Sequence, residues 1–332
     1  MKELKKIKKK LAHLNQIISV SKKPLILVYS NPDPDALASA WALKEIMHSV
    51  GVSAAIGYTG EVGRLENEAM ISSLKIPASA LKEDSLPDTD LIALVDSQPG
   101  FFKPFELPRC DIVIDHHPRE SYRKYAFCDI RPKCLATSSI LTEYLQASGI
   151  NTGTKLATAL HYGIQTDSRN MQRRPTEVDT EAIHFLEKRT NIHLLRCIEF
   201  SSYSLGRLDY FSIALIKLRH SHNVLYSHIG TVDYADVCVQ IADFLIRVKE
   251  AKWALVSGVV GKKLVIVFRC DGHKKHAGKT AHSAFGILGS AGGHKIMGRA
   301  EIIDTALPSG HALTNNEQTE LFILKSIAKV EK

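Results

Sequence analysis

The sequence predicts an α/β protein: a parallel-sheet domain with helices on both faces, and a smaller α/β domain across a cleft. Two observations predict this class. Continuous apolar runs such as 25–29 and 91–95 alternate with helical segments, which is typical of βαβ units with buried parallel strands. From residue 224 onward the pattern changes to short strands. The length of 332 residues suits about two domains with a core each.

The first 22 residues predict a basic amphipathic helix. Its apolar positions alternate spacings of three and four: Leu4, Ile7, Leu11, Leu14 and Ile18. Two heptads are too few for a coiled coil, so we expect packing against the body or a second subunit, with a homodimer left open. Contact with RNA or membrane is the less favoured alternative. Residues 1–10 hold six lysines, so the net charge of +8 is weak evidence for nucleic acid.

Further elements follow the same alternation. Strands are expected at 25–29, 52–58, 91–95, 111–114, 224–229, 253–260 and 264–269. Helices are expected at 36–47, 66–74, 137–145, 155–162, 179–188, 192–200, 210–219 and 235–249. The polar segment 201–206 predicts a domain junction, and residues 271–282 predict a loop rich in lysine and histidine.

Composition narrows the class of protein. Apolar residues make up 45% of the chain and charged residues 23%, as in ordinary globular proteins. No run of about 18 apolar residues and no early hydrophobic segment is found, so neither a membrane span nor a signal peptide is expected. The six cysteines are scattered without a C-x-x-C pair, which favours reduced thiols in a cytoplasmic protein.

Acidic side chains and two histidines follow the predicted strands. They are Asp33 and Asp35 after the first strand, Asp96 after 91–95, Asp115-His116-His117 after 111–114, and Asp167 on a turn after the helix 155–162. The carboxyl ends of parallel strands meet at one edge of a sheet, where α/β proteins bind ligands. We therefore expect these groups to converge.

Structural roles are the alternative for some of these residues. Asp35 can be the N-cap of the following helix, with Asp33 as a turn former. The hydroxyls of residues 137–139 are good N-caps, and the helix start that they open could instead meet a phosphate.

Convergence of so many acids predicts a metal site. Several carboxylates and an imidazole in one cleft cannot stay ionised without divalent cations. Oxygen-rich ligation with some nitrogen favours Mn²⁺, or Mg²⁺, over zinc. A bridged pair of ions about 3.5–4 Å apart activates a water and stabilises the leaving oxygen of a phosphoryl displacement.

These residues also carry a family resemblance. Asn31-Pro32-Asp33-Pro34-Asp35, Asp96, Asp115-His116-His117 and Asp167 resemble, in order, the four motifs of the DHH phosphoesterase superfamily. Gly292-Gly293-His294 with Arg269 upstream resembles the DHHA1 substrate-binding domain. The resemblance spans residues 24–305 and is strongest to the nanoRNase and pAp-phosphatase branch. It implies a Mn²⁺-dependent phosphodiesterase or phosphomonoesterase.

The resemblance implies a metal-binding role for five side chains. Asp33 would bind one ion and Asp35 the other, with Asp96 bridging the two. His116 and Asp167 would complete the coordination of the second ion.

The resemblance also implies groups that act on the substrate. Asp115 would orient the imidazole next to it, and His117 would face the substrate phosphate as a donor. Arg269 and Gly292-Gly293-His294 would hold a terminal phosphate or base, because glycines let backbone N–H groups approach an anion and arginine grips it in bidentate fashion. A plain tight turn is the alternative for the two glycines.

Two positions depart from the family pattern. Tyr29 stands where the family has a histidine, and tyrosine is a poor ligand for Mn²⁺, so the first ion would lack a protein ligand. Asp167 is followed by Ser-Arg-Asn-Met instead of a Thr-Gly-aromatic stretch. Arg169, Arg173 and Arg174 could contact phosphate there or lie in a solvated loop.

The expected function is two-metal hydrolysis of short RNA or DNA oligonucleotides or of small nucleotides such as dinucleotides and pAp. The alternatives are a nucleotide-binding regulator with weakened or lost catalysis and a cyclic-dinucleotide phosphodiesterase. The expected domains are an N-terminal helix at 1–22, a DHH catalytic domain at 23–190, a helical linker at 191–222 and a DHHA1 domain at 223–332.

Overall fold

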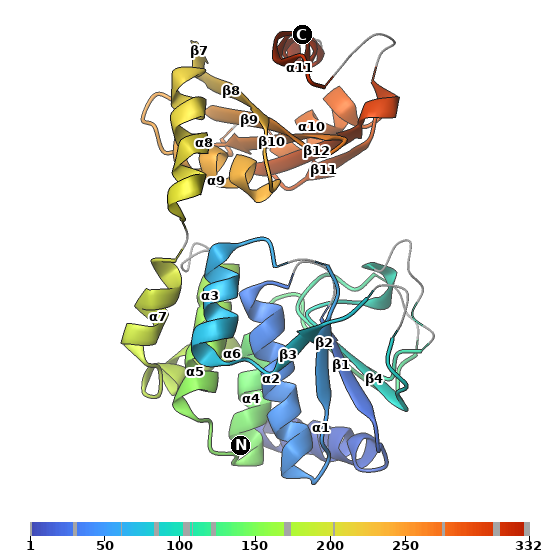
Figure 1. The fold of residues 1–332 in the computed structure, drawn as a ribbon. Helices are drawn as coiled ribbons and strands as arrows, with labels where there is room; N and C mark the ends of the chain where they lie inside the picture. The colour runs from blue at the N-terminus through green and yellow to red at the C-terminus, as the bar shows by residue number, and fades with distance from the viewer. Residues whose placement is uncertain are drawn as a thin grey trace. The chain divides into compact units, whose positions relative to one another are not determined.

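A computed structural model describes most of the chain. The described residues are 2–28, 32–60, 62–82, 86–101, 107, 109–120, 124–168, 174–201, 203–273, 276–307 and 313–328. They form two compact units, Met1–Ser202 and Tyr203–Lys332 (Figure 1). The division between the units lies in the polar segment 201–206.

The first unit is built on a six-stranded parallel sheet in the order β3-β2-β1-β4-β5-β6. Its strands are β1 (Pro24–Val28), β2 (Ala55–Tyr58), β3 (Ala78–Ala80), β4 (Leu91–Val95), β5 (Ile112–Asp115) and β6 (Phe127–Ile130). Every residue of β1 and β4 is buried, which explains their unbroken apolar sequences. The strand order reverses between β1 and β4, and in α/β sheets ligands bind at the carboxyl ends of the strands beside such a reversal. The predicted α/β class is confirmed.

Helices and connecting segments cover the two faces of this sheet unequally. The helices are α1 (Lys2–Ile18), α2 (Pro34–Ser49), α3 (Leu65–Leu74), α4 (Thr137–Ser148), α5 (Thr154–Asp167), α6 (Glu177–Glu187) and α7 (Ile192–Glu199), with a 3₁₀ turn η1 (Pro99–Phe101). All seven contribute to the main core. A smaller cluster covers the other face, where Leu27, Ile92 and Leu94 pack against residues of connecting segments.

The N-terminal helix α1 packs against the body of its own unit, which is one of the two arrangements expected from the sequence. Ile7, Leu11, Leu14 and Ile18 are buried in the main core, and α1 contacts α4 and β6. The ammonium of Lys10 adds an ion pair of 2.7 Å with the buried carboxylate of Asp129. The apolar seam is therefore used within the unit.

Asp167 lies at the end of a helix and not on a turn. The sequence predicts a helix that ends at residue 162, but α5 continues through Gly163 to Asp167. A Cβ atom at Gly163 would lie 2.7 Å from the Ser138 hydroxyl and 3.0 Å from the Cα of Asp35. This glycine permits close packing of α5 on α2 and α4 and does not end the helix.

The second unit is built on a mixed sheet in the order β11-β12-β10-β9-β8-β7, in which only β8 and β9 pair in parallel. Its strands are β7 (Arg219–Ser221), β8 (Val224–Thr231), β9 (Trp253–Val260), β10 (Lys263–Cys270), β11 (Ser290–Gly293) and β12 (Met297–Ile303). Its helices are α8 (Leu205–Ile216), α9 (Asp236–Leu245), α10 (Ala277–Phe285) and α11 (Asn316–Ala328), with a 3₁₀ turn η2 (Asp304–Ala306).

The predicted loop at 271–282 is wrong over its second half. Residues from Ala277 onward form α10, whose Ala277 and Ala281 are buried beside Phe285 in a core of this unit. The helix could not be recognised from the sequence, because its few apolar residues are mostly small and lie among lysine and histidine. Within the described part of the chain, no helix is both long and apolar enough to cross a membrane.

The burial of α1 can be tested by truncating one side chain of its seam. Leu14 is fully buried, so Leu14→Ala should lower the free energy of unfolding by about 2–5 kcal/mol through lost burial and a cavity. Val20, just after the helix, is 80% exposed, and Val20→Ala should change this free energy by less than about 0.5 kcal/mol. Chemical denaturation of the metal-free proteins measures both values, and equal stabilities would contradict the packing of α1.

Candidate metal site

The loop after β1 holds the first two acids, with their capping roles opposite to those of the sequence alternative. Asp33 is the N-cap of α2, because its Oδ1 accepts a hydrogen bond of 2.9 Å from the N–H of Ala36. Asp35 lies inside the first turn of α2 and is fully buried. The alternative in which Asp35 is the N-cap and Asp33 only forms the turn is therefore wrong.

The carboxylate of Asp35 is held by the N-terminus of α4. The N–H groups of Thr137 and Ser138 each donate to it at 2.7 Å. The α4 helix has no side-chain cap of its own among the described residues, so this carboxylate satisfies two of its open amides. The helix start meets an acid of the chain, and the hydroxyls of 137–139 do not act as its N-cap.

Asp96 is turned toward the same place by an uncommon backbone conformation. Its φ is 55°, in the left-handed region that aspartate tolerates better than most residues. Its N–H donates to the carbonyl of Ile114 on β5, which keeps the residue in the sheet edge. Its Oδ1 accepts a hydrogen bond of 2.9 Å from the Thr137 hydroxyl. Thr137 thus contacts two acids that follow different strands.

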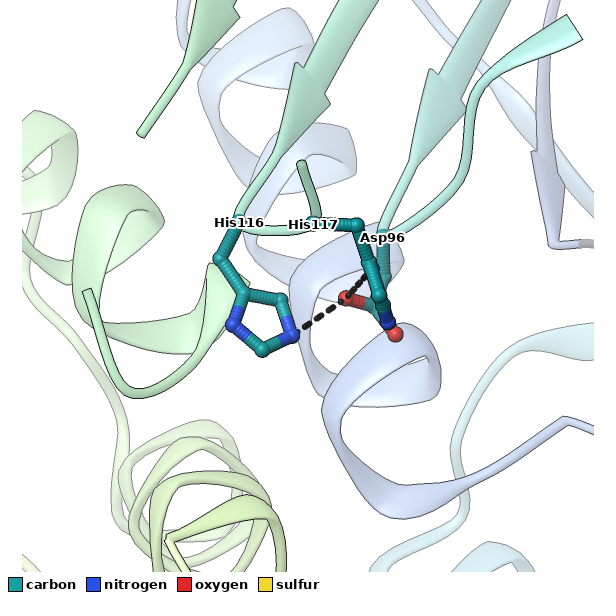
Figure 2. Close-up of side chains that lie close together, drawn as sticks. All are labelled: Asp96, His116 and His117. Atoms are coloured by element: carbon teal, nitrogen blue, oxygen red, sulfur yellow. Dashed lines mark ion pairs between the residues drawn. The ribbon is translucent and has the colours of Figure 1, made fainter. Parts of the chain in front are cut away.

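The two histidines after β5 both approach the Asp96 carboxylate (Figure 2). Oδ1 of Asp96 is 3.4 Å from Nε2 of His116 and 3.7 Å from Nδ1 of His117. His116 is buried, whereas the side chain of His117 is 43% exposed. Of the two imidazoles, His117 is the one that Asp115 contacts, with 2.9 Å between Oδ1 and Nδ1.

The last acid reaches the site from the end of α5. Oδ2 of Asp167 lies 3.0 Å from Nε2 of His116. Two groups of side chains have ligand atoms within 4.8 Å of one another: Asp35, His116 and Asp167, and Asp96, His116 and His117. The structure thus brings together acids from the ends of β1, β4 and α5 around one imidazole.

Burial and mutual repulsion disfavour ionised carboxylates here. Burial raises the pKa of Asp33 to about 6, with the charge of Asp35 adding to the effect. Burial and the charge of Asp167 raise the pKa of Asp35. Burial, followed by the charges of Asp35 and Asp33, holds the pKa of Asp96 well above its usual value. In the absence of a cation the cluster therefore retains protons.

The imidazole of His116 has the donor geometry of a metal ligand. Its Nδ1 faces the carbonyl oxygen of Cys134 at 3.3 Å, which favours a proton on Nδ1 and leaves the lone pair on Nε2. Within the described residues the buried Nε2 has no hydrogen-bond partner of suitable geometry. Burial lowers the pKa of His116, but the nearby carboxylates of Asp167 and Asp35 outweigh it and raise the pKa to about 9. A divalent cation in place of that proton suits these oxygen and nitrogen atoms.

The predicted substrate-binding residues lie in the second unit. The guanidinium of Arg269 is largely buried and pairs with Asp243, with 2.5 Å from Nε to Oδ1. Gly292 and Gly293 belong to β11 and pair with β12, so the tight-turn alternative is wrong. Gly293 has a φ of 131°, and a Cβ there would lie 2.4 Å from the carbonyl oxygen of Met297. The next residue, His294, is exposed.

Several sequence expectations fall outside the described residues. They are Tyr29 in place of the family histidine, Asn31 of the first motif, and the arginines Arg169 and Arg173. Three contacts of the site were missed by sequence reasoning: the Cys134 carbonyl, the Thr137 hydroxyl on Asp96 and the amide of Gln98 on Asp115. A backbone carbonyl cannot be recognised from the sequence, because every residue has one. A hydroxyl side chain at the start of a helix is more readily interpreted as an N-cap.

The protonation of the cluster predicts pH-dependent metal binding. A metal held by these residues would have to displace the proton of His116, whose pKa is about 9, and below about pH 6 also the proton of Asp33. Affinity for Mn²⁺ should therefore rise with pH up to about 9, and fall more steeply below about 6. Calorimetry in two buffers of different ionisation enthalpy should show net proton release near neutral pH. Binding without proton release would contradict this account.

The hydroxyl of Thr137 predicts a positioning effect on metal affinity. Thr137→Val removes the donor to Asp96 without a large change in shape, and should weaken Mn²⁺ binding by about 10–100-fold. Thr137→Ser keeps the hydroxyl and should bind like the parent. Thr142→Val is a matched control, because that buried hydroxyl donates to the carbonyl of Ser138 in the same helix. An equal loss in both valine variants would show a general effect on α4.

Comparisons with known proteins agree with this architecture. The model of the DHH family, N-terminal domain, matches residues 23–164. An uncharacterised protein of Methanocaldococcus jannaschii is 33% identical over 313 residues, which are 90% of this chain and 64% of that protein. The chain thus spans just under two thirds of the length of this relative.

Solved structures share the fold at low sequence identity. An exopolyphosphatase-related protein from Bacteroides fragilis superposes with a TM-score of 0.69 and 14% identity over 98% of both chains. RecJ from Thermus thermophilus, in complex with Mn²⁺, superposes with a TM-score of 0.54 and 14% identity over 97% of this chain and 55% of RecJ. The parallel sheet, the acids Asp35 and Asp96 and the His116-His117 pair all lie within the segment 23–164, which matches the model of the DHH family, N-terminal domain.

Proposed function

We propose that this protein is a divalent-metal-dependent phosphoesterase that hydrolyses short oligonucleotides or small nucleotides. The observation that carries the proposal is the convergence of three acids on the buried Nε2 of His116, from chain segments far apart in the sequence. The match to the model of the DHH family, N-terminal domain, supports the reaction class. The Mn²⁺ in the RecJ structure of similar fold supports the choice of metal.

The proposed ligands would hold two ions. Asp35, His116 and Asp167 would hold one ion, Asp33 would bind the other, and Asp96 would be shared between the two. When bound, a pair of divalent ions supplies an activated water and stabilises the leaving oxygen of a phosphate ester. The number of ions and the identity of Mn²⁺ are part of the proposal.

The chain itself supplies positioning and charge. The N-terminus of α4 fixes Asp35 by two amides and Asp96 by one hydroxyl, so two ligands keep their orientation when the metal is exchanged. His117 is fixed by Asp115 through Nδ1 and is partly exposed beside Asp96, which suits a donor to a substrate phosphate. Ordered ligands lower the reorganisation needed at each turnover.

We propose that residues of the second unit bind the substrate. Arg269 and Gly292-Gly293-His294 would contact a terminal phosphate or base, as the resemblance to DHHA1 domains implies. Arg269 already pairs with Asp243, so a substrate phosphate would bind the guanidinium in competition with that carboxylate or beside it. Residues 23–190, within the first unit, are proposed as the catalytic part, and residues 223–332, within the second unit, as the substrate-binding part.

The test is hydrolysis of a nucleotide panel with an acid-to-amide variant at the centre of the site. The parent should hydrolyse pApA, pAp or bis-p-nitrophenyl phosphate with Mn²⁺, lose activity with a chelator and regain it with added Mn²⁺. Asp96→Asn should lower kcat by about 10²–10³-fold or more, because it removes a buried charge at the proposed bridge. Asp88→Asn is the matched control, because the Asp88 side chain is 85% exposed.

The outcomes separate the two classes of function. Hydrolysis by the parent and by Asp88→Asn, but not by Asp96→Asn, supports the phosphoesterase. Tight nucleotide binding without hydrolysis over a series of divalent metals would instead identify the nucleotide-binding regulator. Activity of Asp96→Asn equal to that of the parent would overturn the proposed site.

A further inference from the structure

A buried glutamine braces the segment that carries both histidines. Gln98 is 2% exposed and follows Asp96 by two residues. Its Nε2 donates to Oδ2 of Asp115 at 2.7 Å and to the carbonyl of Pro118 at 3.0 Å. Its Oε1 accepts from the N–H of Glu120 at 2.9 Å. Because one end of the amide meets two acceptors and the other end meets a donor, only one orientation of the side chain fits.

The carboxylate of Asp115 is divided between Gln98 and His117. Oδ2 receives the amide of Gln98, while Oδ1 receives the backbone N–H of His117 at 3.1 Å and lies 2.9 Å from its ring Nδ1. Asp115 is fully buried, so a lost donor would leave part of a buried charge unsatisfied. Gln98 thus fixes the orientation of the carboxylate that faces the imidazole.

The imidazole held in this way lies at the edge of the metal site. Nδ1 of His117 is 3.7 Å from Oδ1 of Asp96, and its ring meets the ring of His116 edge-on with 4.5 Å between centroids. With Nδ1 directed at Asp115, the ring plane is set and a proton is kept on Nδ1. The partly exposed ring therefore meets solvent or substrate in a fixed orientation.

We infer that Gln98 is a positioning residue for His117 that acts through the carboxylate of Asp115. This inference rests on the proposed phosphoesterase function, in which His117 faces the substrate. Gln98 touches neither the ligand cluster around His116 nor the ring of His117 in any hydrogen bond among the described residues. Its effect should therefore fall on turnover and not on metal affinity.

Two substitutions of similar size separate the donor from the shape of Gln98. Gln98→Leu removes both donor and acceptor. Gln98→Glu keeps an acceptor for the N–H of Glu120 but places a second carboxylate against Asp115. Gln146→Leu is the control, because Gln146 is exposed on α4. His117→Gln identifies the ring signals of His117.

The first measurement uses the metal-free protein labelled with ¹⁵N-histidine. Magnetic resonance should show a proton held on Nδ1 of His117 in the parent and in Gln146→Leu. Gln98→Leu and Gln98→Glu should shift both ring nitrogen signals and speed exchange of the Nδ1 proton. Unchanged signals in both Gln98 variants would overturn the inference.

The second measurement uses the Mn²⁺-loaded proteins. Gln98→Leu should lower kcat by about tenfold or more, with KM and the calorimetric affinity for Mn²⁺ within about twofold of the parent. Loss of Mn²⁺ affinity together with kcat would show a general structural role and overturn the inference. If the parent hydrolyses no substrate, the proposed function fails, while the ¹⁵N measurement still decides whether Gln98 orients His117.

Discussion

The carboxylate of Asp35 on the N-terminus of α4 is the contact on which the rest of the site depends. Two backbone amides hold it at 2.7 Å each, and they belong to a helix that begins about 100 residues later in the chain. A helix N-terminus carries partial positive charge, so it offsets part of the cost of burying this acid. The same helix start reaches Asp96 through the hydroxyl of Thr137. One helix end therefore aligns acids that follow two neighbouring strands, β1 and β4.

The segment before α4 serves the imidazole in the same way. Between β6 and α4 the N–H of Arg131 donates to the carbonyl of Asp115, the N–H of Leu135 donates to Asp179, and the carbonyl of Cys134 faces His116. Asp129 at β6 adds contacts from Lys10 of α1, from Arg131 and from Tyr144. Burial raises the pKa of Asp129, but the hydrogen bonds and charges of Arg131 and Lys10 hold it below its usual value. The N-terminal helix thus stabilises the framework that carries the metal-binding segment.

The arrangement explains why so many acids are tolerated in one place. Asp33, Asp35 and Asp96 all have raised pKa values through burial, whereas Asp115 keeps a lowered one despite its burial, because His117 and Gln98 donate to it. Among the described residues, Asp115 accepts hydrogen bonds from both His117 and Gln98, whereas Asp33 accepts one from Ala36 and Asp96 one from Thr137. Protein groups therefore satisfy the supporting acid, and an ion is left to satisfy the ligands.

The sequence by itself determined the α/β class, the buried parallel strands and the candidate ligands, because continuous apolar runs that end in acids or histidines are local patterns. The predictions from sequence that proved wrong concern local patterns that are set by contacts with distant segments. Gly163 does not end a helix, because close packing against Asp35 and Ser138 requires a residue without Cβ. Only the tertiary structure decided which acid caps α2, which imidazole Asp115 holds, and which groups lie behind the ligands. Those choices depend on contacts between segments tens of residues apart, such as Asp35 with Thr137 and Gln98 with Asp115, and no spacing in the sequence encodes such distances.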